Sequence, residues 1–122
     1  MARVLVIDDE PDVVRLIGKV LSGRGHLVST ERDGAAALHR VSVEPPDVII
    51  VDSELPKLEG AEVCRRIKTD AATKGIPIVL MTSRYIDLYE VGLEDGPDAF
   101  VVRPFARETL ASAVERALTR RA

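Results

Sequence analysis

One stretch of this sequence, residues 47–56, constrains the fold more than any other. Its apolar run over 48–51 is rich in β-branched side chains and stops at a carboxylate, Asp52, with Pro56 four residues later. A parallel strand covered by helices on both faces reads as such a continuous apolar run, and ligands bind just beyond the carboxyl ends of these strands. The stretch therefore predicts a buried strand that delivers Asp52 to a reactive loop. On this stretch alone, Asp52 could equally open a turn, since Asp-Ser pairs commonly do so.

The same alternation of short apolar runs and amphipathic segments continues along the chain. Strands are predicted at 3–7, 27–30, 48–51, 76–81 and 99–102, and helices from Pro11, from Asp33-Gly34, from Gly60, over 83–93 and over 108–117. Apolar residues at helical spacing, and breaks at glycine or proline, set these limits. Repeats of a strand and then a helix predict an α/β fold with a parallel sheet, formed as one domain over residues 1–122.

Composition excludes several classes of protein. A chain of 122 residues can form one core without disulfides, and the single cysteine, Cys64, excludes an internal disulfide framework. Cys64 shares a helical face with Val63 and Ile67, so we expect it to be a small core residue. The net charge of −3 gives no basic field for nucleic acid. No leader-like or membrane-spanning pattern is recognisable, so we expect a soluble cytoplasmic protein without membrane or direct nucleic acid contacts.

Acidic residues follow the first predicted strand as well as the third. Right-handed crossovers and a reversal of strand order bring the ends of these strands together, so we expect Asp8, Asp9 and Asp52 to converge. Carboxylates that lie this close raise one another's pKa unless a cation intervenes, and oxygen ligands of this kind suit Mg²⁺. The alternative is that the acidic run from Asp8 to Glu10 only places negative charge at a helix N-terminus, which is stabilising by itself.

The fourth and fifth predicted strands end in further polar groups. Thr82 follows the fourth strand, and Arg103 with Pro104 follows the fifth. An acid cluster, a hydroxyl and a cation facing one pocket are what phosphoryl transfer needs. Taken alone, Thr82 could cap a helix and Arg103 could be an ordinary surface charge. Their common position after successive strands favours a site.

Together these motifs resemble those of a known family, the receiver domains of response regulators in two-component signalling. The resemblance covers essentially the whole chain. It rests on Asp8-Asp9 with Glu10-Pro11, Asp33-Gly34, the run from Asp52 to Pro56 with Gly60, Thr82-Ser83, residues 96–100, and Pro104-Phe105. It implies a doubly wound, flavodoxin-like sheet of five parallel strands in the order 2-1-3-4-5, similar to that of chemotaxis regulators.

The resemblance also implies the chemistry. Asp52 would accept a phosphoryl group from a sensor histidine kinase or a phosphotransfer protein. Mg²⁺ would be the cofactor, held directly by Asp9, mainly through water by Asp8, and also by Asp52 and the main-chain carbonyl of Glu54. The chain would not be an enzyme toward other molecules, because it would catalyse only its own phosphorylation and dephosphorylation.

The switch implied by the resemblance depends on residues after the fourth and fifth strands. Thr82 would donate its hydroxyl to a phosphoryl oxygen, and Phe100 would turn inward when Thr82 moves. The Arg103–Pro104 peptide bond would be cis, as bonds before proline can be. Phosphorylation would then alter the face made by the fourth helix, fifth strand and fifth helix, where a downstream protein target binds.

One position departs from the family's pattern. A lysine usually precedes this proline, and this sequence has Arg103. Arginine keeps the charge, but its planar fork prefers bidentate contacts, whereas lysine is a compact point charge. Arg103 could pair with Asp52 before phosphorylation, or it could clamp the phosphoryl group from farther out. An alternative function is therefore a receiver-like protein-interaction module that works without phosphate.

Glu54 supports two further hypotheses. A magnesium-dependent phosphohydrolase on a similar sheet would need a general acid/base two residues beyond its nucleophile, and Glu54 stands at that spacing from Asp52. Within the receiver family, Glu54 and Arg84 would flank the acyl phosphate, and we hypothesise that they form an ion pair that slows its hydrolysis.

Overall fold

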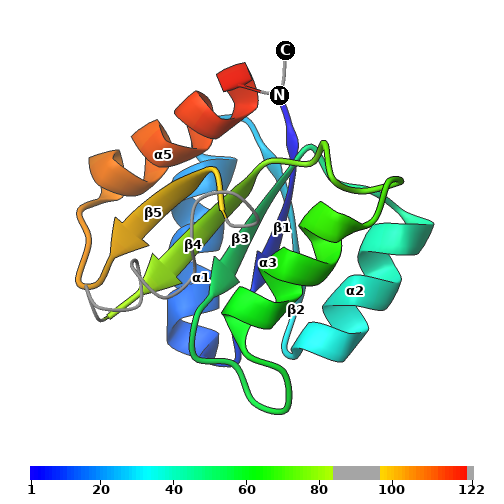
Figure 1. The fold of residues 1–122 in the computed structure, drawn as a ribbon. Coiled ribbons are helices and arrows are strands. Elements are labelled where there is room, and N and C mark those ends of the chain that lie inside the picture. The colour runs from blue at the N-terminus through cyan, green and yellow to red at the C-terminus, as the bar shows by residue number, and fades with distance from the viewer. Residues whose placement is uncertain (84–96, 121–122) are drawn as a thin grey trace.

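The computed structural model describes residues 1–83 and 97–120 and contains a parallel sheet of five strands. The strands are β1 (Arg3–Ile7), β2 (Leu27–Glu31), β3 (Val48–Asp52), β4 (Ile78–Thr82) and β5 (Ala99–Val102). They lie side by side in the order β2-β1-β3-β4-β5, as Figure 1 shows. Every pairing of neighbouring strands is parallel. The predicted doubly wound sheet and its strand order are therefore confirmed.

Helices cover both faces of this sheet. They are α1 (Pro11–Ser22), α2 (Gly34–Val43), α3 (Gly60–Thr69) and α5 (Arg107–Arg120). In Figure 1, α1 and α5 lie against one face, and α2 and α3 lie against the other. The helix predicted over 83–93 falls outside the described residues from position 84 onward. Within residues 1–83 and 97–120, no helix has the length and hydropathy needed to cross a membrane.

Alternate residues of the strands supply two separate cores. In β1, Val4 and Val6 are buried on the side of α1 and α5, whereas Leu5 and Ile7 are buried on the side of α2 and α3. β3 and β4 are buried at every position. This burial on both faces is the reason that the strands read as continuous apolar runs. Cys64 lies in the second core as predicted, and burial raises the pKa of its thiol to about 12.

Local chemistry sets where helices begin. Pro11 occupies the first turn of α1, where its missing N–H costs nothing. Asp33 precedes α2, and its carboxylate accepts a hydrogen bond from the Ala36 N–H at 2.8 Å. The last helix is longer than the predicted 108–117 and runs over Arg107–Arg120, because helix ends carry weaker periodic signals than helix centres.

The start of β4 differs from its prediction. The strand was expected from Ile76, but its ladder begins at Ile78. Pro77 has no N–H to donate to a neighbouring strand, and it contributes only its carbonyl, which accepts from the Ile49 N–H at 3.0 Å. The apolar pattern therefore extends two residues beyond the hydrogen-bonded strand.

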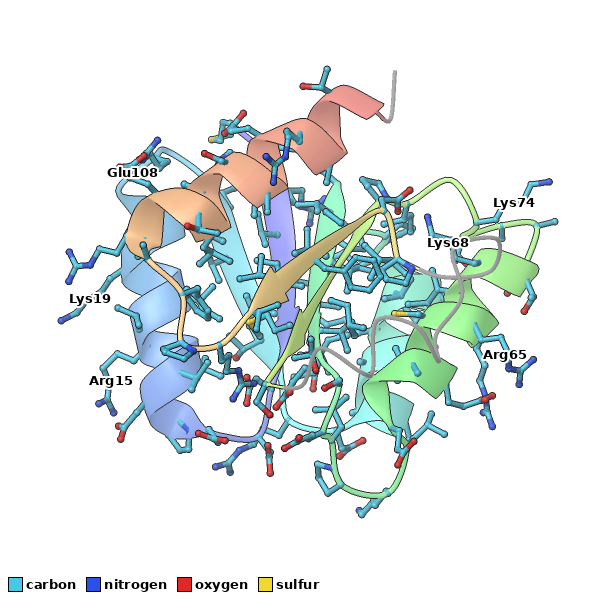
Figure 2. The ribbon with its side chains drawn as sticks, turned by 60° about the vertical axis from the view of Figure 1, so that its left-hand side comes forward. Arg15, Lys19, Arg65, Lys68, Lys74 and Glu108 are labelled. Atoms are coloured by element: carbon cyan, nitrogen blue, oxygen red, sulfur yellow. The ribbon has the colours of Figure 1, made fainter. Side chains whose placement is uncertain are left out.

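A partly buried ion pair holds the amino end of β4. Figure 2 shows Arg15 on α1 and Arg65 on α3 projecting away from the sheet. Lys68 is different, because its side chain is only 14% exposed and its Nζ lies 2.8 Å from Asp98 Oδ2. The same carboxylate oxygen accepts from the Ile78 N–H at 2.8 Å. Asp98 thus connects α3, β4 and the start of β5.

Replacing Asp98 by alanine is expected to lower the free energy of unfolding by roughly 2 kcal/mol, because the Ile78 N–H loses its side-chain acceptor and the partly buried ammonium of Lys68 loses its counter-charge. Urea unfolding followed by circular dichroism measures this loss. Glu108→Ala is the matched control, since Glu108 pairs with Arg24 at the surface and its removal should cost only about 0.5 kcal/mol. Equal losses in the two variants would contradict the structural role of Asp98.

Candidate functional site

Four strands deliver polar side chains to one edge of the sheet. Asp8 follows β1, Asp52 closes β3, Thr82 closes β4 and Arg103 follows β5. The carboxyl ends of parallel strands share one edge, so Asp8 and Arg103 meet although they are 95 positions apart in the sequence. The structure therefore places the predicted acids, hydroxyl and cation at the same end of the sheet.

Two buried carboxylates form the centre of this site. Asp8 is 1% exposed and Asp52 is 3% exposed. The Glu10 N–H donates to Asp8 Oδ1 at 2.9 Å. In the same way, the Glu54 N–H donates to Asp52 Oδ1 at 3.1 Å. Each acid is thus held by the backbone of the residue two positions later, with its second oxygen directed to another partner.

A third carboxylate, that of Glu10, was not among the predicted ligands. One oxygen from each of Asp8, Glu10 and Asp52 lies within 4.8 Å of the other two. Asp9, which the sequence predicts as a direct metal ligand, is exposed and is not part of this group. Its role as a ligand stays a prediction. The position of Glu10 two residues after Asp8 is the sequence signal that could have indicated it. The turn in which the Glu10 N–H donates to Asp8 also brings the Glu10 side chain back to the site.

The environment of Asp8 favours its protonated form. Burial raises the pKa of Asp8 to about 6, and the negative charges of Asp52 and Glu10 act in the same direction. The hydrogen bond from the Glu10 N–H and the charge of Arg103 oppose this shift without cancelling it. A further positive charge close to Asp8 would therefore stabilise its ionised form near neutral pH.

Arg103 supplies the positive charge that the structure contains. Its Nη2 lies 2.8 Å from Asp52 Oδ2 and 3.0 Å from Asp8 Oδ2, and its Nη1 lies 3.5 Å from Glu10 Oε1. The pKa of the Arg103 guanidinium is raised overall. Burial lowers it, but the charge and hydrogen bond of Asp52 and the charge of Asp8 together outweigh this effect. The peptide bond from Arg103 to Pro104 is cis, as predicted. Of the two arrangements considered for Arg103, the structure shows the pairing with Asp52.

Gly60 positions the main chain of Asp52. A Cβ atom at Gly60 would lie 2.1 Å from the Asp52 carbonyl oxygen, so the first residue of α3 packs directly against the end of β3. The Gly60 N–H donates to the Ser53 carbonyl at 3.1 Å. The sequence identified Gly60 only as the start of a helix, and its contact with Asp52 could not be predicted from spacing.

A side-chain hydrogen bond joins the loops after β3 and β4. Ser83 Oγ donates a hydrogen bond to Glu54 Oε1 at 3.1 Å. The preceding Thr82 is fully buried at the end of β4. The hypothesised ion pair between Glu54 and Arg84 concerns a residue outside the described part of the chain.

Phe100 lies on β5, opposite Leu80 of β4 in the sheet register. Its side chain is half-buried and packs against the core shared by α2 and α3. It is thus partly exposed, which leaves room for a change in burial. Its coupling to Thr82 stays a prediction.

The donor set fits a hard divalent cation. Carboxylate oxygens from Asp8, Glu10 and Asp52 converge, and Mg²⁺ prefers one or two carboxylates together with waters or phosphate oxygens. Burial, together with the charges of Asp52 and Glu10, holds the pKa of Asp8 above its usual range, so a further cation would favour its ionised form. A buried carboxylate next to a cation and a hydroxyl can act as a nucleophile toward phosphorus, with donors available for the phosphoryl oxygens.

Comparisons with known proteins agree with this geometry. The family model described as the response regulator receiver domain matches residues 4–115. The DNA-binding response regulator MtrA of Mycolicibacterium smegmatis is 37% identical over 120 residues, which make up 97% of this chain and 51% of that protein. The chain thus spans about half the length of the curated relatives that it matches.

Solved structures give the same picture for the fold. The chemotaxis response regulator CheY4 of Vibrio cholerae is 30% identical, with a TM-score of 0.88 over 96% of this chain and 98% of that chain. The signal receiver domain of a signal transduction histidine kinase from Syntrophus aciditrophicus is also 30% identical, with a TM-score of 0.89 over 98% and 91% of the two chains.

Proposed function

Because this chain belongs to the response regulator receiver family, we propose that it is a cytoplasmic signalling switch that accepts a phosphoryl group on Asp52. The observation that carries the proposal is the placement of Asp52. Its carboxylate is 3% exposed at the end of a strand buried at every position, and one of its oxygens lies 2.8 Å from the Arg103 guanidinium. The donor would be a phosphohistidine on a sensor kinase or a phosphotransfer protein.

The transfer step follows from the groups around Asp52. Its carboxylate supplies the electron pair of the new oxygen–phosphorus bond, the phosphorus–nitrogen bond of the donor breaks, and the histidine nitrogen leaves with the bonding pair and gains a proton from solvent. The product is an acyl phosphate on Asp52. Thr82 and Arg103 would donate hydrogen bonds to the equatorial phosphoryl oxygens, which stabilises the charge that spreads over them.

Metal binding would fall to the acids beside Asp52. Asp8, Asp9, Asp52 and the main-chain carbonyl of Glu54 are the proposed ligands, and Glu10 is a further candidate because its carboxylate lies within 4.8 Å of those of Asp8 and Asp52. When bound, Mg²⁺ neutralises the charge of the phosphoryl oxygens and of the acids themselves. The protein's part is to hold these oxygens in place before the donor arrives.

The output would be a change of binding surface. We propose that Thr82 follows the phosphoryl group and that Phe100 then buries its ring more deeply, which alters the face that includes β5 and α5. Phe100 supports this proposal because it is half-buried and lies two positions along β5 from the end that neighbours Thr82. A downstream protein would bind the altered face. The fourth helix of this proposed face lies outside the described residues.

Intact mass after incubation with acetyl phosphate and Mg²⁺ tests the proposed function. We expect the wild-type protein to gain one phosphoryl group, and Asp52→Asn or removal of Mg²⁺ by a chelator to abolish the gain, since the nucleophile or the counter-charge is then missing. Asp12→Asn, which changes an exposed acid of α1, is the matched control and should be phosphorylated like the wild type. A folded wild-type protein that binds Mg²⁺ but gains no phosphoryl group would contradict the proposal.

A further inference from the structure

A single nitrogen of Arg103 bridges the two buried acids of the site. Nη2 lies 3.0 Å from Asp8 Oδ2 and 2.8 Å from Asp52 Oδ2. Nη1 of the same guanidinium lies 3.5 Å from Glu10 Oε1. The contacts of Arg103 are therefore the same three carboxylates that form the candidate metal group.

A metal ion that bridged Asp8 and Asp52 would exclude this arrangement of the guanidinium. A magnesium ion lies about 2 Å from each of its oxygen ligands and repels a neighbouring cation. An ion that bridged Asp8 and Asp52 through these oxygens would have to enter the space that Nη2 fills. Either the ion or the guanidinium can neutralise this pair of acids, but both cannot do so in the same place.

The structure also offers a position to which the side chain could move. Beside Arg103 lies a cavity of about 470 Å³, lined also by Glu10, Val13, Leu16 and Phe105. Glu10 is 59% exposed at the rim of the site. Its carboxylate already lies 3.5 Å from Nη1 and could keep the guanidinium paired after Asp8 and Asp52 are released, while the aliphatic stem packs on Val13 and Leu16.

One hydrogen-bond donor of the Arg103 side chain is unsatisfied in its present position. Its Nε is buried and finds no hydrogen-bond partner among the described residues. A buried donor without a partner costs free energy. The bridged arrangement thus leaves one buried donor unsatisfied, which lowers its stability relative to an arrangement in which Nε has a partner.

We propose that Arg103 is the resident counter-ion of the acidic pocket and that Mg²⁺ binds by displacing its guanidinium from between Asp8 and Asp52 toward Glu10. This inference rests on the magnesium site of the proposed function. Arg103 therefore weakens metal binding in the resting protein, and metal binding releases the side chain that follows β5. The planar fork of arginine adds the contact of Nη1 with Glu10 to this bridge, and a lysine ammonium, which is a single point charge, would not make all three contacts in the same way.

Calorimetric titration of Mg²⁺ into chelator-treated protein, without any phosphodonor, tests this competition. We expect Arg103→Gln to bind Mg²⁺ about ten- to a hundredfold more tightly than the wild type, because one positive charge no longer occupies the pocket. Arg103→Lys should lie between the two. Arg116→Gln removes an equal charge from the exposed side of α5 and should leave the affinity unchanged.

The titration tests the competition between Arg103 and Mg²⁺ separately from the magnesium site itself. Equal or weaker Mg²⁺ binding by Arg103→Gln, or equal tightening by Arg116→Gln, would overturn the competition while leaving the magnesium site intact. Absence of binding in every variant would instead overturn the magnesium site of the proposed function. If Arg103→Gln does not fold in chelator, Arg103→Lys decides, since the proposal requires it to bind Mg²⁺ more tightly than the wild type.

A second measurement follows the side chain itself. In the wild-type protein, the Nε–H resonance of Arg103 should shift during the Mg²⁺ titration with the same midpoint as the heat of binding, whereas that of Arg116 should not shift. Binding of Mg²⁺ without any change at the Arg103 resonance would show that the guanidinium stays in place, and would reject the displacement.

Discussion

Alanine at Gly60 is expected to destabilise the protein by about 3 kcal/mol or more, because the added methyl group would overlap the main chain that carries Asp52. Its Cβ would lie 2.1 Å from the Asp52 carbonyl oxygen and 2.8 Å from the Ser53 Cα, and neither is the end of a flexible side chain. Either α3 must move away from β3 or Asp52 must shift. Urea unfolding measures the loss, and intact mass after acetyl phosphate treatment measures the effect on the site.

Gly18→Ala provides the control for Gly60→Ala. Gly18 lies inside α1, and a Cβ atom there meets nothing within 4 Å. Alanine is expected to stabilise this helix by about 0.5 to 1 kcal/mol, because it restricts the unfolded chain more than glycine does. A Gly60→Ala protein as stable as the wild type would show that the contact between α3 and Asp52 is not close in solution.

The pH dependence of stability should show that the ionised form of Asp8 is unfavourable in the folded protein. The pKa of Asp8 is raised from 3.8 to about 6 in the folded protein, so the folded state binds this proton more tightly than the unfolded state does. Its contribution to stability is therefore fully present below pH 4 and is lost as the pH rises through 6. In chelator, the free energy of unfolding of the wild type should fall by roughly 2 to 3 kcal/mol over this interval relative to Asp8→Asn.

The controls for Asp8 use a second acid and the metal. Asp12→Asn alters an exposed carboxyl group, so its stability should follow the wild type at every pH. Saturating Mg²⁺ should reverse the trend in the wild type, because the ion favours the ionised form of Asp8 and is released when the acids of the site are protonated at low pH. Parallel curves for Asp8→Asn and the wild type in chelator would refute the raised pKa.

The sequence predicts the fold well because its signals are local and repeated. Buried strands such as β3 need apolar side chains on both faces, and helices such as α2 need a capping group such as Asp33, so each element leaves its own mark. The common edge for Asp8, Asp52 and Arg103 then follows from the rule for parallel sheets. What could be predicted was the set of strands that meet and the charge of the residues at their ends.

Contacts that depend on side-chain reach could not be predicted in this way. The sequence did not indicate Glu10, and the structure brings its carboxylate to the buried pair. The role of Asp9 as a direct ligand stays a prediction. The sequence left two arrangements open for Arg103, and the bridge to Asp8 was not among them. The approach of Gly60 to Asp52 depends on how α3 docks, which no local pattern encodes. These contacts are settled by packing, after the elements have formed.

The ion pair of Arg103 with Asp8 connects two strands that are not neighbours in the sheet. Arg103 follows β5, and Asp8 follows β1, so β3 and β4 lie between the two strands that this ion pair connects. A sheet is stiff across its hydrogen-bonded strands, and a change at the end of β1 would otherwise have to pass through two of them. One side chain spans this distance at the open edge and also contacts Asp52 of β3, so it joins the ends of β1, β3 and β5 directly and not through the hydrogen bonds of the sheet.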